Sequence, residues 1–266
     1  MTKSLVQSQF GANAANYVTS KVHAKGASLA RLVDLVAPQK TWRMLDIATG
    51  AGHTALAFAP HVAHVVASDL TPQMLVQAAN LAWEIGFANV ETAEADAENL
   101  PFDEATFDLV TCRIAPHHFQ SPPAFVAEAA RVLRPGGTFA MVDNISPDAE
   151  LTLGFSRAEL TDAAITYNAF EKIRDPSHVR ALAMAEWTEL LEECGLELIH
   201  KEHNPKVMDF SDWCRNMSVP AETAVRLDSM LRNPSPAFAA YIRPHEEEGA
   251  LAFVLEEAIL IGRKPG

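Results

Sequence analysis

The chain has 266 residues, of which 48% are hydrophobic and 21% charged, and its formal net charge at pH 7 is −13. This length can bury the core of one large α/β domain or two small ones without disulfides or metal ions. The negative charge excludes non-specific binding to nucleic acid or anionic membranes as an expected function, because both surfaces would repel the chain.

The cysteines and the chain's hydropathy point to a reducing, aqueous environment. Cys112, Cys194 and Cys214 form no C-x-x-C pair, so neither a disulfide framework nor a bound metal is expected. The first residues lack the apolar core of a signal peptide, and no apolar run has the length of a membrane helix. We therefore expect a cytoplasmic protein without membrane insertion.

Strands and helices are expected to alternate up to residue 143. Apolar residues recur at helical spacing within 4–37, and Pro38 would end that helix. Further expected elements are strands at 43–48, 62–68, 90–95, 107–113 and 138–143, helices at 53–59, 72–85 and 122–133, and a tight turn at 134–137. A β-α rhythm predicts a parallel sheet with helices on both faces.

The rhythm changes after residue 143. Helices are expected at 148–172 and 186–194, and strands at 196–203 and 252–263. The aromatic and apolar segment 205–250 could roof a substrate pocket, bury a partner subunit in a homodimer, or form a satellite core. The expected organisation is a helical cap (1–40), a cofactor-binding core (41–145), its continuation with a helical insertion (146–204), a lid insertion (205–250) and a last strand (251–266).

A glycine loop after the first expected strand is the main functional signal. Gly50 and Gly52 at a strand-to-helix turn would let a ligand approach the backbone. Asp69, at the end of the next strand, could accept both hydrogen bonds of a ribose diol. By itself this pattern fits a dinucleotide, a methyl donor, or a turn without a ligand.

Two further acids favour the methyl donor. Asp46 lies inside the first strand, where it would repel a pyrophosphate but could serve the ammonium of an amino-acid ligand, directly or through water. Asp96 follows the third strand and could accept from an adenine amino group. The segment RVLRPGG at 131–137, just before the fifth strand, also favours the methyl donor.

The segments LDIATGAGHTA, ASDLTPQML, AEADAENLPFDEATFDLVTCRIAPHHF and RVLRPGGTFAMVD, within 43–143, resemble class I S-adenosylmethionine-dependent methyltransferases of the ubiquinone/menaquinone-biosynthesis type. The resemblance implies a Rossmann-like, doubly wound, seven-stranded sheet with an antiparallel last strand, a helical cap and a helical lid. It also implies methyl transfer from S-adenosylmethionine to a small molecule at oxygen, nitrogen or carbon. If segment 205–250 is an apolar lid, it would suit an aromatic or otherwise hydrophobic acceptor. An NAD-dependent oxidoreductase, although the chain lacks a Tyr-x-x-x-Lys pair, and a cofactor-binding protein without transfer activity remain the alternatives.

The same resemblance assigns cofactor contacts. The methionine part of the cofactor would be lined by Asp46, Ala48, Gly50 and Gly52, and Asp69 would hold the ribose. The adenine would lie beside Leu70, Met74, Asp96 and Ala97. Arg113 and His118 would lie near the sulfonium. Ala48 replaces a glycine of many relatives and is expected to be tolerated with φ below zero. Tyr17 and Ser20 would lie on one face of a cap helix over the cofactor.

Residues after the fourth and fifth strands are expected to face the transferred methyl group. His117 and His118 are therefore candidate general bases, although a capping or packing role would also explain them. A second polar cluster, 171–180, contains Arg174 and His178. These two could reach the substrate, or the cluster could be a structural turn.

Overall fold

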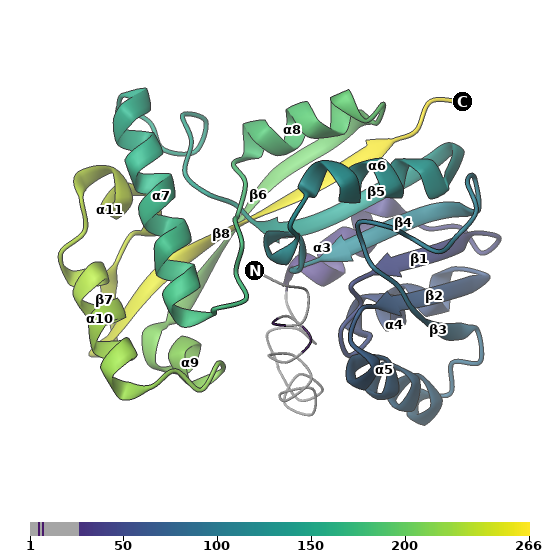
Figure 1. Ribbon diagram of the computed structural model, residues 1–266, viewed down its shortest axis with the longest axis horizontal. Coiled ribbons are helices and arrows are strands. Elements are labelled where there is room, and N and C mark those ends of the chain that lie inside the picture. The colour runs from purple at the N-terminus through teal and green to yellow at the C-terminus, as the bar shows by residue number, and fades with distance from the viewer. Residues whose placement is uncertain (1–4, 6, 8–26) are drawn as a thin grey trace. The chain divides into compact units, whose positions relative to one another are not determined.

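The protein is described by a computed structural model that covers Leu5, Gln7 and residues 27–266 (Figure 1). The expected cap residues Tyr17 and Ser20 lie outside these described residues. Within the described part, no helix is long and apolar enough to cross a membrane. No group of three or more His, Cys, Asp or Glu side chains in that part could hold a metal ion.

The first half of the chain alternates strands and helices as expected. The strands are β1 Arg43–Ile47, β2 His64–Asp69, β3 Val90–Glu94, β4 Phe107–Arg113 and β5 Leu133–Asn144. The helices are α3 Ala27–Val36, α4 His53–Phe58, α5 Pro72–Ile85 and α6 Pro122–Val132, with the 3-10 turns η1 Ala59–His61 and η2 Pro116–His118.

The second half is mostly helical between two long strands. The helices are α7 Arg157–Arg174, α8 Met184–Glu193, α9 Phe210–Arg215, α10 Ala221–Arg232 and α11 Pro236–Ile242. The strands are β6 Glu197–Asp209, β7 His245–Glu247 and β8 Ala250–Arg263.

The strands form one sheet in the order β3-β2-β1-β4-β5-β8-β6, with the short β7 paired to β8. β1 to β5 are parallel. β8 runs antiparallel to β5, because Gly136 N–H donates to Lys264 O near the start of β5 and Ile145 N–H donates to Glu256 O after its end. The predicted doubly wound sheet with an antiparallel last strand is confirmed. β7 brings the sheet to eight strands.

The strand order reverses between β1 and β4. From β1 the chain moves outward to β2 and β3, and then returns to place β4 on the other side of β1. Loops beyond the carboxyl ends of strands at such a reversal leave a crevice that binds ligands in open α/β sheets. The topology therefore places the expected site beside β1, β2, β4 and β5.

The chain divides into two compact units. Unit 1 comprises the chain up to Asp143 together with 189–202 and 259–266, and unit 2 comprises 144–188 and 203–258. The core of unit 1 contains Leu32, Val36, Met44, Ala55, Phe58, Val65, Leu109, Val142 and Ile259. Strands buried on both faces need such continuous apolar runs. Asp46 is therefore an exception in β1, since its side chain is charged yet buried.

The core of unit 2 is built largely from the segment expected to form a lid. Met208, Phe210, Trp213, Leu231, Phe238 and Tyr241 are all buried in one cluster. Trp213 stacks on Phe170 with ring centroids 4.8 Å apart, and Phe253 packs edge-on against both rings. Met230 packs against the cluster from a partly buried position, and Met217 is also partly buried. These contacts favour the satellite core among the three alternatives for segment 205–250.

Three expected boundaries are wrong. The strand expected at 196–203 continues to Asp209 as β6. The turn at 134–137 is instead the irregular start of β5, where the register with β4 shifts between Phe107 and Leu109. The helix expected from residue 148 begins at Arg157, because Ser156 and Glu159 form a capping box that fixes the helix start. Upstream, the Asp148 carboxylate accepts from the N–H groups of Glu150 and Leu151, which stabilises a turn there instead of a helix.

Candidate functional site

The glycine loop joins β1 to α4 in a shape that requires glycine. Gly50 and Gly52 have φ of 55° and 89°, in the left-handed region. A Cβ on Gly52 would lie 3.0 Å from the Cβ of Ala78, so a side chain there would collide with α5. A Cβ on Gly50 would meet no described atom within 4 Å. The loop therefore presents open space beside its backbone, as a bound cofactor would need.

Asp46 holds the glycine loop from inside β1. One carboxylate oxygen accepts from Thr49 Oγ1 at 2.6 Å and from Ala55 N–H at 3.2 Å, and the other accepts from Thr111 Oγ1 of β4 at 2.6 Å. The side chain is buried. Sequence reasoning expected Asp46 to serve a ligand ammonium, whereas the observed bonds tie its two oxygens to the loop, α4 and β4. Its contacts are those of a residue that organises the site.

Burial raises the pKa of Asp46 to about 6, because the three hydrogen bonds and Arg113 only partly compensate the lost hydration. The folded-state pKa thus exceeds the unfolded value of about 3.9, and folding takes up a proton between those two values. The contribution of Asp46 to stability should fall as pH rises through this window. The loss should reach about 3 kcal/mol at neutral pH, at 1.36 kcal/mol per pKa unit.

We expect Asp46→Asn to remove this pH dependence. Urea unfolding of the cofactor-free protein at pH 4 and pH 7 gives the stability difference between wild type and variant. That difference should shift against the wild type by about 2 kcal/mol between the two pH values, because the unfolded carboxyl is already partly ionised at pH 4. A constant difference would mean that folding does not raise the pKa of Asp46.

Ala48 corrects a sequence-based expectation. Its φ is 52°, in the left-handed region, and not below zero as expected. Ala48 lies where the chain leaves β1 for the glycine loop, and the next residue, Thr49, donates its N–H to Ser68 O of β2 at 2.8 Å. A residue with a Cβ is strained in this conformation, which explains why glycine suits the position.

Ala48→Gly should therefore stabilise the protein by about 0.5–1 kcal/mol, which is the relief of left-handed strain less the added flexibility of the unfolded chain. Ala51→Gly is a matched control in the same loop. Ala51 is buried and has no positive φ, so that change should destabilise. The two free energies of unfolding in urea provide the comparison, and equal destabilisation by both changes would refute the assigned strain.

Asp69 ties the end of β2 to its neighbours. Its Oδ2 accepts from Gly50 N–H at 2.9 Å and its Oδ1 from Thr71 N–H at 2.8 Å. Its backbone carbonyl accepts from Ala95 N–H at 3.1 Å, just after β3. Burial raises the pKa of Asp69 against the opposing effect of these N–H donors. Each carboxylate oxygen can accept a second bond, so the carboxylate suits a ribose diol.

The expected adenine residues follow β2 and β3 in the chain. Leu70 is partly exposed, and its carbonyl accepts from Gln7 Nε2 at 2.8 Å. Met74 of α5 is buried, and so is Ala97 in the loop after β3. Asp96 is partly exposed and accepts from Glu98 N–H at 3.1 Å. The structure thus brings the ends of β2 and β3 together through Asp69 and Ala95.

The histidine pair follows β4 in the turn η2. His117 Nδ1 lies 2.6 Å from Asp143 Oδ1 of β5, and both side chains are buried. The rings of His117 and His118 are 4.2 Å apart. Just upstream, Ile114 has a φ of 54°, which is rare for a β-branched residue and typical of strain near functional sites. Arg113 Nε donates to Thr54 Oγ1 at 3.1 Å, linking β4 to α4.

The buried carboxylates give this edge of the sheet a negative field. Cys112 of β4 lies within reach of Asp46, Asp143 and Asp69, which together with burial hold the pKa of its thiol well above the usual range. The thiol is therefore protonated and unsuited to nucleophilic chemistry. A site with this field fits a cationic ligand such as a sulfonium, and would repel a pyrophosphate.

Arg174 and His178 belong to unit 2 and make structural contacts there. The Arg174 guanidinium lies over the Trp213 ring at 4.5 Å, and its Nε donates to the Trp213 carbonyl. His178 is buried, with Nε2 2.9 Å from Asn168 Oδ1. These contacts favour the structural turn over a substrate role for the cluster 171–180.

Sequence reasoning did not identify the partners of the site residues. Thr49 and Thr111 hold Asp46, and Asp143 holds His117. A sequence signal for Asp143 does exist, because an acid near the end of a strand adjacent to β4 would lie at the same edge of a parallel sheet. No comparable local pattern distinguishes Thr111 from an ordinary strand threonine.

This chain is similar to several known proteins. Residues 45–141 match the family described as "Methyltransferase domain". The uncharacterized methyltransferase YcgJ of Bacillus subtilis (strain 168) is 33% identical over 231 residues, which cover 86% of each protein. Protein BH2331 from Bacillus halodurans C-125 is 38% identical in sequence. Its crystal structure superposes with a TM-score of 0.82, and the match covers 91% of this chain and 100% of the BH2331 chain. A demethylmenaquinone methyltransferase of Clavibacter sepedonicus is 39% identical, but over 44% of this chain and 46% of that protein.

Proposed function

This chain belongs to the S-adenosylmethionine-dependent methyltransferases, and we propose that it transfers the methyl group to a small hydrophobic molecule at an atom that loses a proton. Family membership removes the NAD-dependent alternative. The quinone-biosynthesis relative overlaps less than half of the chain, so its acceptor does not carry over. The observation that carries the proposal is the buried pair His117–Asp143 at the carboxyl ends of β4 and β5.

The residues at the sheet edge fit the cofactor, which when bound supplies an electrophilic methyl group on a sulfonium. Asp69 would accept from the ribose hydroxyls, and Asp96 from the adenine amino group. The loop backbone at Gly50 would face the methionine part, with Asp46 holding that loop in place. Buried acids around β4 would favour the positive charge of the donor.

His117 would act as the general base. A carboxylate can only accept, so Nδ1–H donates to Asp143, and in the neutral ring the basic lone pair is on Nε2. That nitrogen would take the proton from the acceptor atom as it attacks the methyl carbon. Asp143 would stabilise the resulting imidazolium and fix the orientation of the ring.

The surroundings of His117 favour a neutral, apolar acceptor. Ala115 and Pro116 are buried beside the histidine pair, and Phe119 packs against Phe125 with ring centroids 4.8 Å apart. An anionic acceptor would lose hydration and would face the negative field of the buried acids around β4. Phenols and quinols meet both requirements, since they are apolar and the attacking oxygen or attacking ring carbon carries the proton that is lost.

Transfer of labelled methyl from S-adenosylmethionine to matched panels of phenols, quinols, amines and thiols tests the proposal. We expect phenols or quinols to be methylated faster than the amines and thiols. Transfer confined to amines that need not lose a proton during attack would overturn the proposed base and acceptor class. Such a result would leave the family assignment intact.

A further inference from the structure

The loop between β3 and β4, residues 95–106, is held mainly by one helix, α6. Within this loop the described secondary structure is an isolated bridge between Asp96 and Asn99. Ala95 N–H donates to the Asp69 carbonyl at the loop's start. The Glu98 side chain accepts from Ser121 N–H, at the start of α6, at 2.7 Å. The loop that carries Asp96 and Ala97 therefore depends on α6 for its shape.

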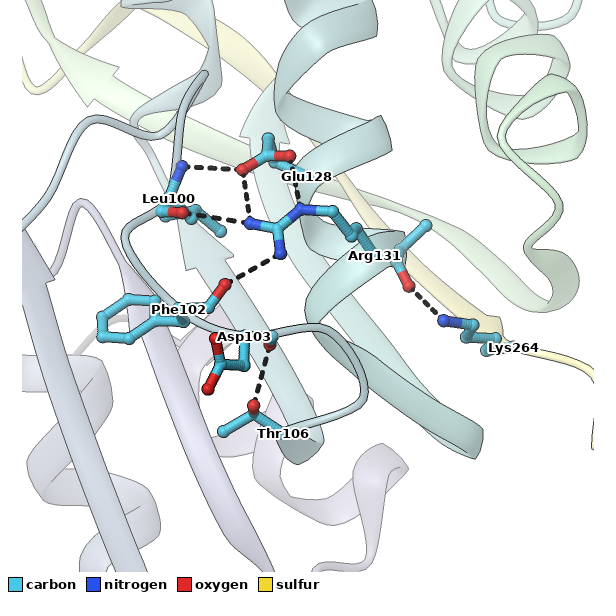
Figure 2. A network of polar contacts seen from close by, with 8 residues as sticks. Leu100, Phe102, Asp103, Thr106, Glu128, Arg131 and Lys264 are labelled. Atoms are coloured by element: carbon cyan, nitrogen blue, oxygen red, sulfur yellow. Dashed lines mark hydrogen bonds and ion pairs between the residues drawn. The ribbon is translucent and has the colours of Figure 1, made fainter.

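Arg131 makes most of the connection between α6 and the loop (Figure 2). Its Nη1 donates to the Phe102 carbonyl at 2.8 Å, and its Nη2 donates to the Leu100 carbonyl at 3.0 Å. The same guanidinium forms a two-point pair with the Glu128 carboxylate at 2.7 and 2.8 Å. A planar guanidinium can make these bonds together, whereas a lysine ammonium cannot.

Glu128 completes the clamp on Leu100. Its Oε2 accepts from Leu100 N–H at 2.7 Å, so the N–H and C=O of one loop residue are both held by α6 side chains. The Arg131 guanidinium holds the pKa of Glu128 below its usual range, so the carboxylate is charged. Leu100 itself is buried, which anchors the loop a few residues beyond Asp96 and Ala97.

We propose that Arg131, with Glu128, is a positioning residue that sets the selectivity of the cofactor site for adenine. The clamp holds Leu100 and Phe102, and through the short bridged turn it sets where Asp96 lies relative to Asp69. The inference rests on the proposed contact between Asp96 and the adenine amino group. Arg131 would contact neither the base nor the acceptor, and would act through the loop.

Selectivity between two bases separates positioning from mere structural support. S-inosyl-L-homocysteine differs from S-adenosyl-L-homocysteine by an oxygen in place of the adenine amino group. A misplaced Asp96 loses its preference between the two compounds, whereas a generally less stable protein binds both more weakly in equal proportion. The wild type should prefer the adenosyl compound by about tenfold or more, the usual effect of a hydrogen bond to a charged group.

Calorimetric titration of the full chain with both compounds provides the test. Arg131→Met should reduce the preference for the adenosyl compound to about twofold or less, because the hydrogen bond between the adenine amino group and Asp96 is lost. Arg131→Lys and Glu128→Gln should give a preference between that of the wild type and that of Arg131→Met. These two variants provide the test if Arg131→Met does not fold. Arg134→Met is the matched control. Arg134 also pairs with an acid, Asp108, and with a backbone carbonyl, that of Ala105, but it does not bind Leu100 or Phe102.

An unchanged preference in the folded Arg131 and Glu128 variants would overturn the inference while leaving the cofactor site as proposed. Equal loss of preference in Arg134→Met would also overturn it, because the effect would not depend on the clamp. A wild type that binds both compounds equally would refute the contact of Asp96 with adenine and the inference together. Failure of the wild type to bind S-adenosyl-L-homocysteine would instead count against the cofactor site itself.

Discussion

Replacing His117 with glutamine is expected to lower kcat for methyl transfer by about 100- to 10,000-fold, the usual contribution of a general base. The rate should be measured with the best acceptor from the phenol and quinol panel, and the affinity for S-adenosylhomocysteine should stay close to that of the wild type. Glutamine keeps a polar side chain of similar reach but cannot take up a proton. The loss should therefore fall on kcat and not on cofactor binding.

The pair with Asp143 gives this prediction its physical basis. Asp143 Oδ1 lies 2.6 Å from His117 Nδ1 in a buried setting, where a carboxylate stabilises a positively charged imidazole strongly. Asp143→Asn should keep much of the geometry but can present an N–H to the ring, which favours the wrong tautomer. We expect that change to lower kcat in the same direction as His117→Gln.

His118→Gln is the matched control, since its ring lies 4.2 Å from that of His117 and is equally buried. It should reduce kcat far less than His117→Gln. The acidic limb of the pH–rate profile should persist in the His118 variant and disappear in the His117 variant. A larger loss in His118→Gln would move the base to the second histidine, and an unchanged rate in both variants would remove the base from the mechanism.

Asp69→Asn is expected to weaken binding of S-adenosylhomocysteine by about 100-fold or more, since two ribose hydrogen bonds to a charged group would be affected and each contributes about 1.5–3 kcal/mol. The carboxylate now accepts from Gly50 N–H and Thr71 N–H and would accept from the ribose as well. An amide offers one acceptor oxygen, and its NH2 group would face a backbone N–H. The change should therefore disturb the ribose contact and the glycine loop together.

Asp108→Asn is a suitable control for this binding measurement. Asp108 also accepts from a backbone N–H, that of Arg43, and from an arginine, Arg134, but it lies at the opposite end of β4 from the site. Calorimetric titration should give wild-type affinity for Asp108→Asn. If both variants bind S-adenosylhomocysteine like the wild type, Asp69 does not hold the ribose.

Much of unit 1 could be predicted because its signals are local. A buried parallel strand shows up as an apolar run, and β4 has the boundaries predicted for it, 107–113. Thr71-Pro72 and Gly86 bracket α5 as predicted. The start of α7 was harder to predict. The turn at Asp148 and the Ser156–Glu159 capping box together place the beginning of the helix at Arg157.

The sequence by itself determined strand β1, the glycine loop after it, and the acids Asp69 and Asp96 that point to the cofactor, because these features lie within a few residues of a strand end. Only the tertiary structure decided which side chains Asp46 and His117 contact. Asp46 is bound to Thr111, 65 residues away, and His117 meets Asp143, 26 residues away. The tertiary structure also placed the aromatic residues of 205–250 in the core of unit 2. Strand register and side-chain packing decide these contacts, and neither is written in a local stretch of the chain.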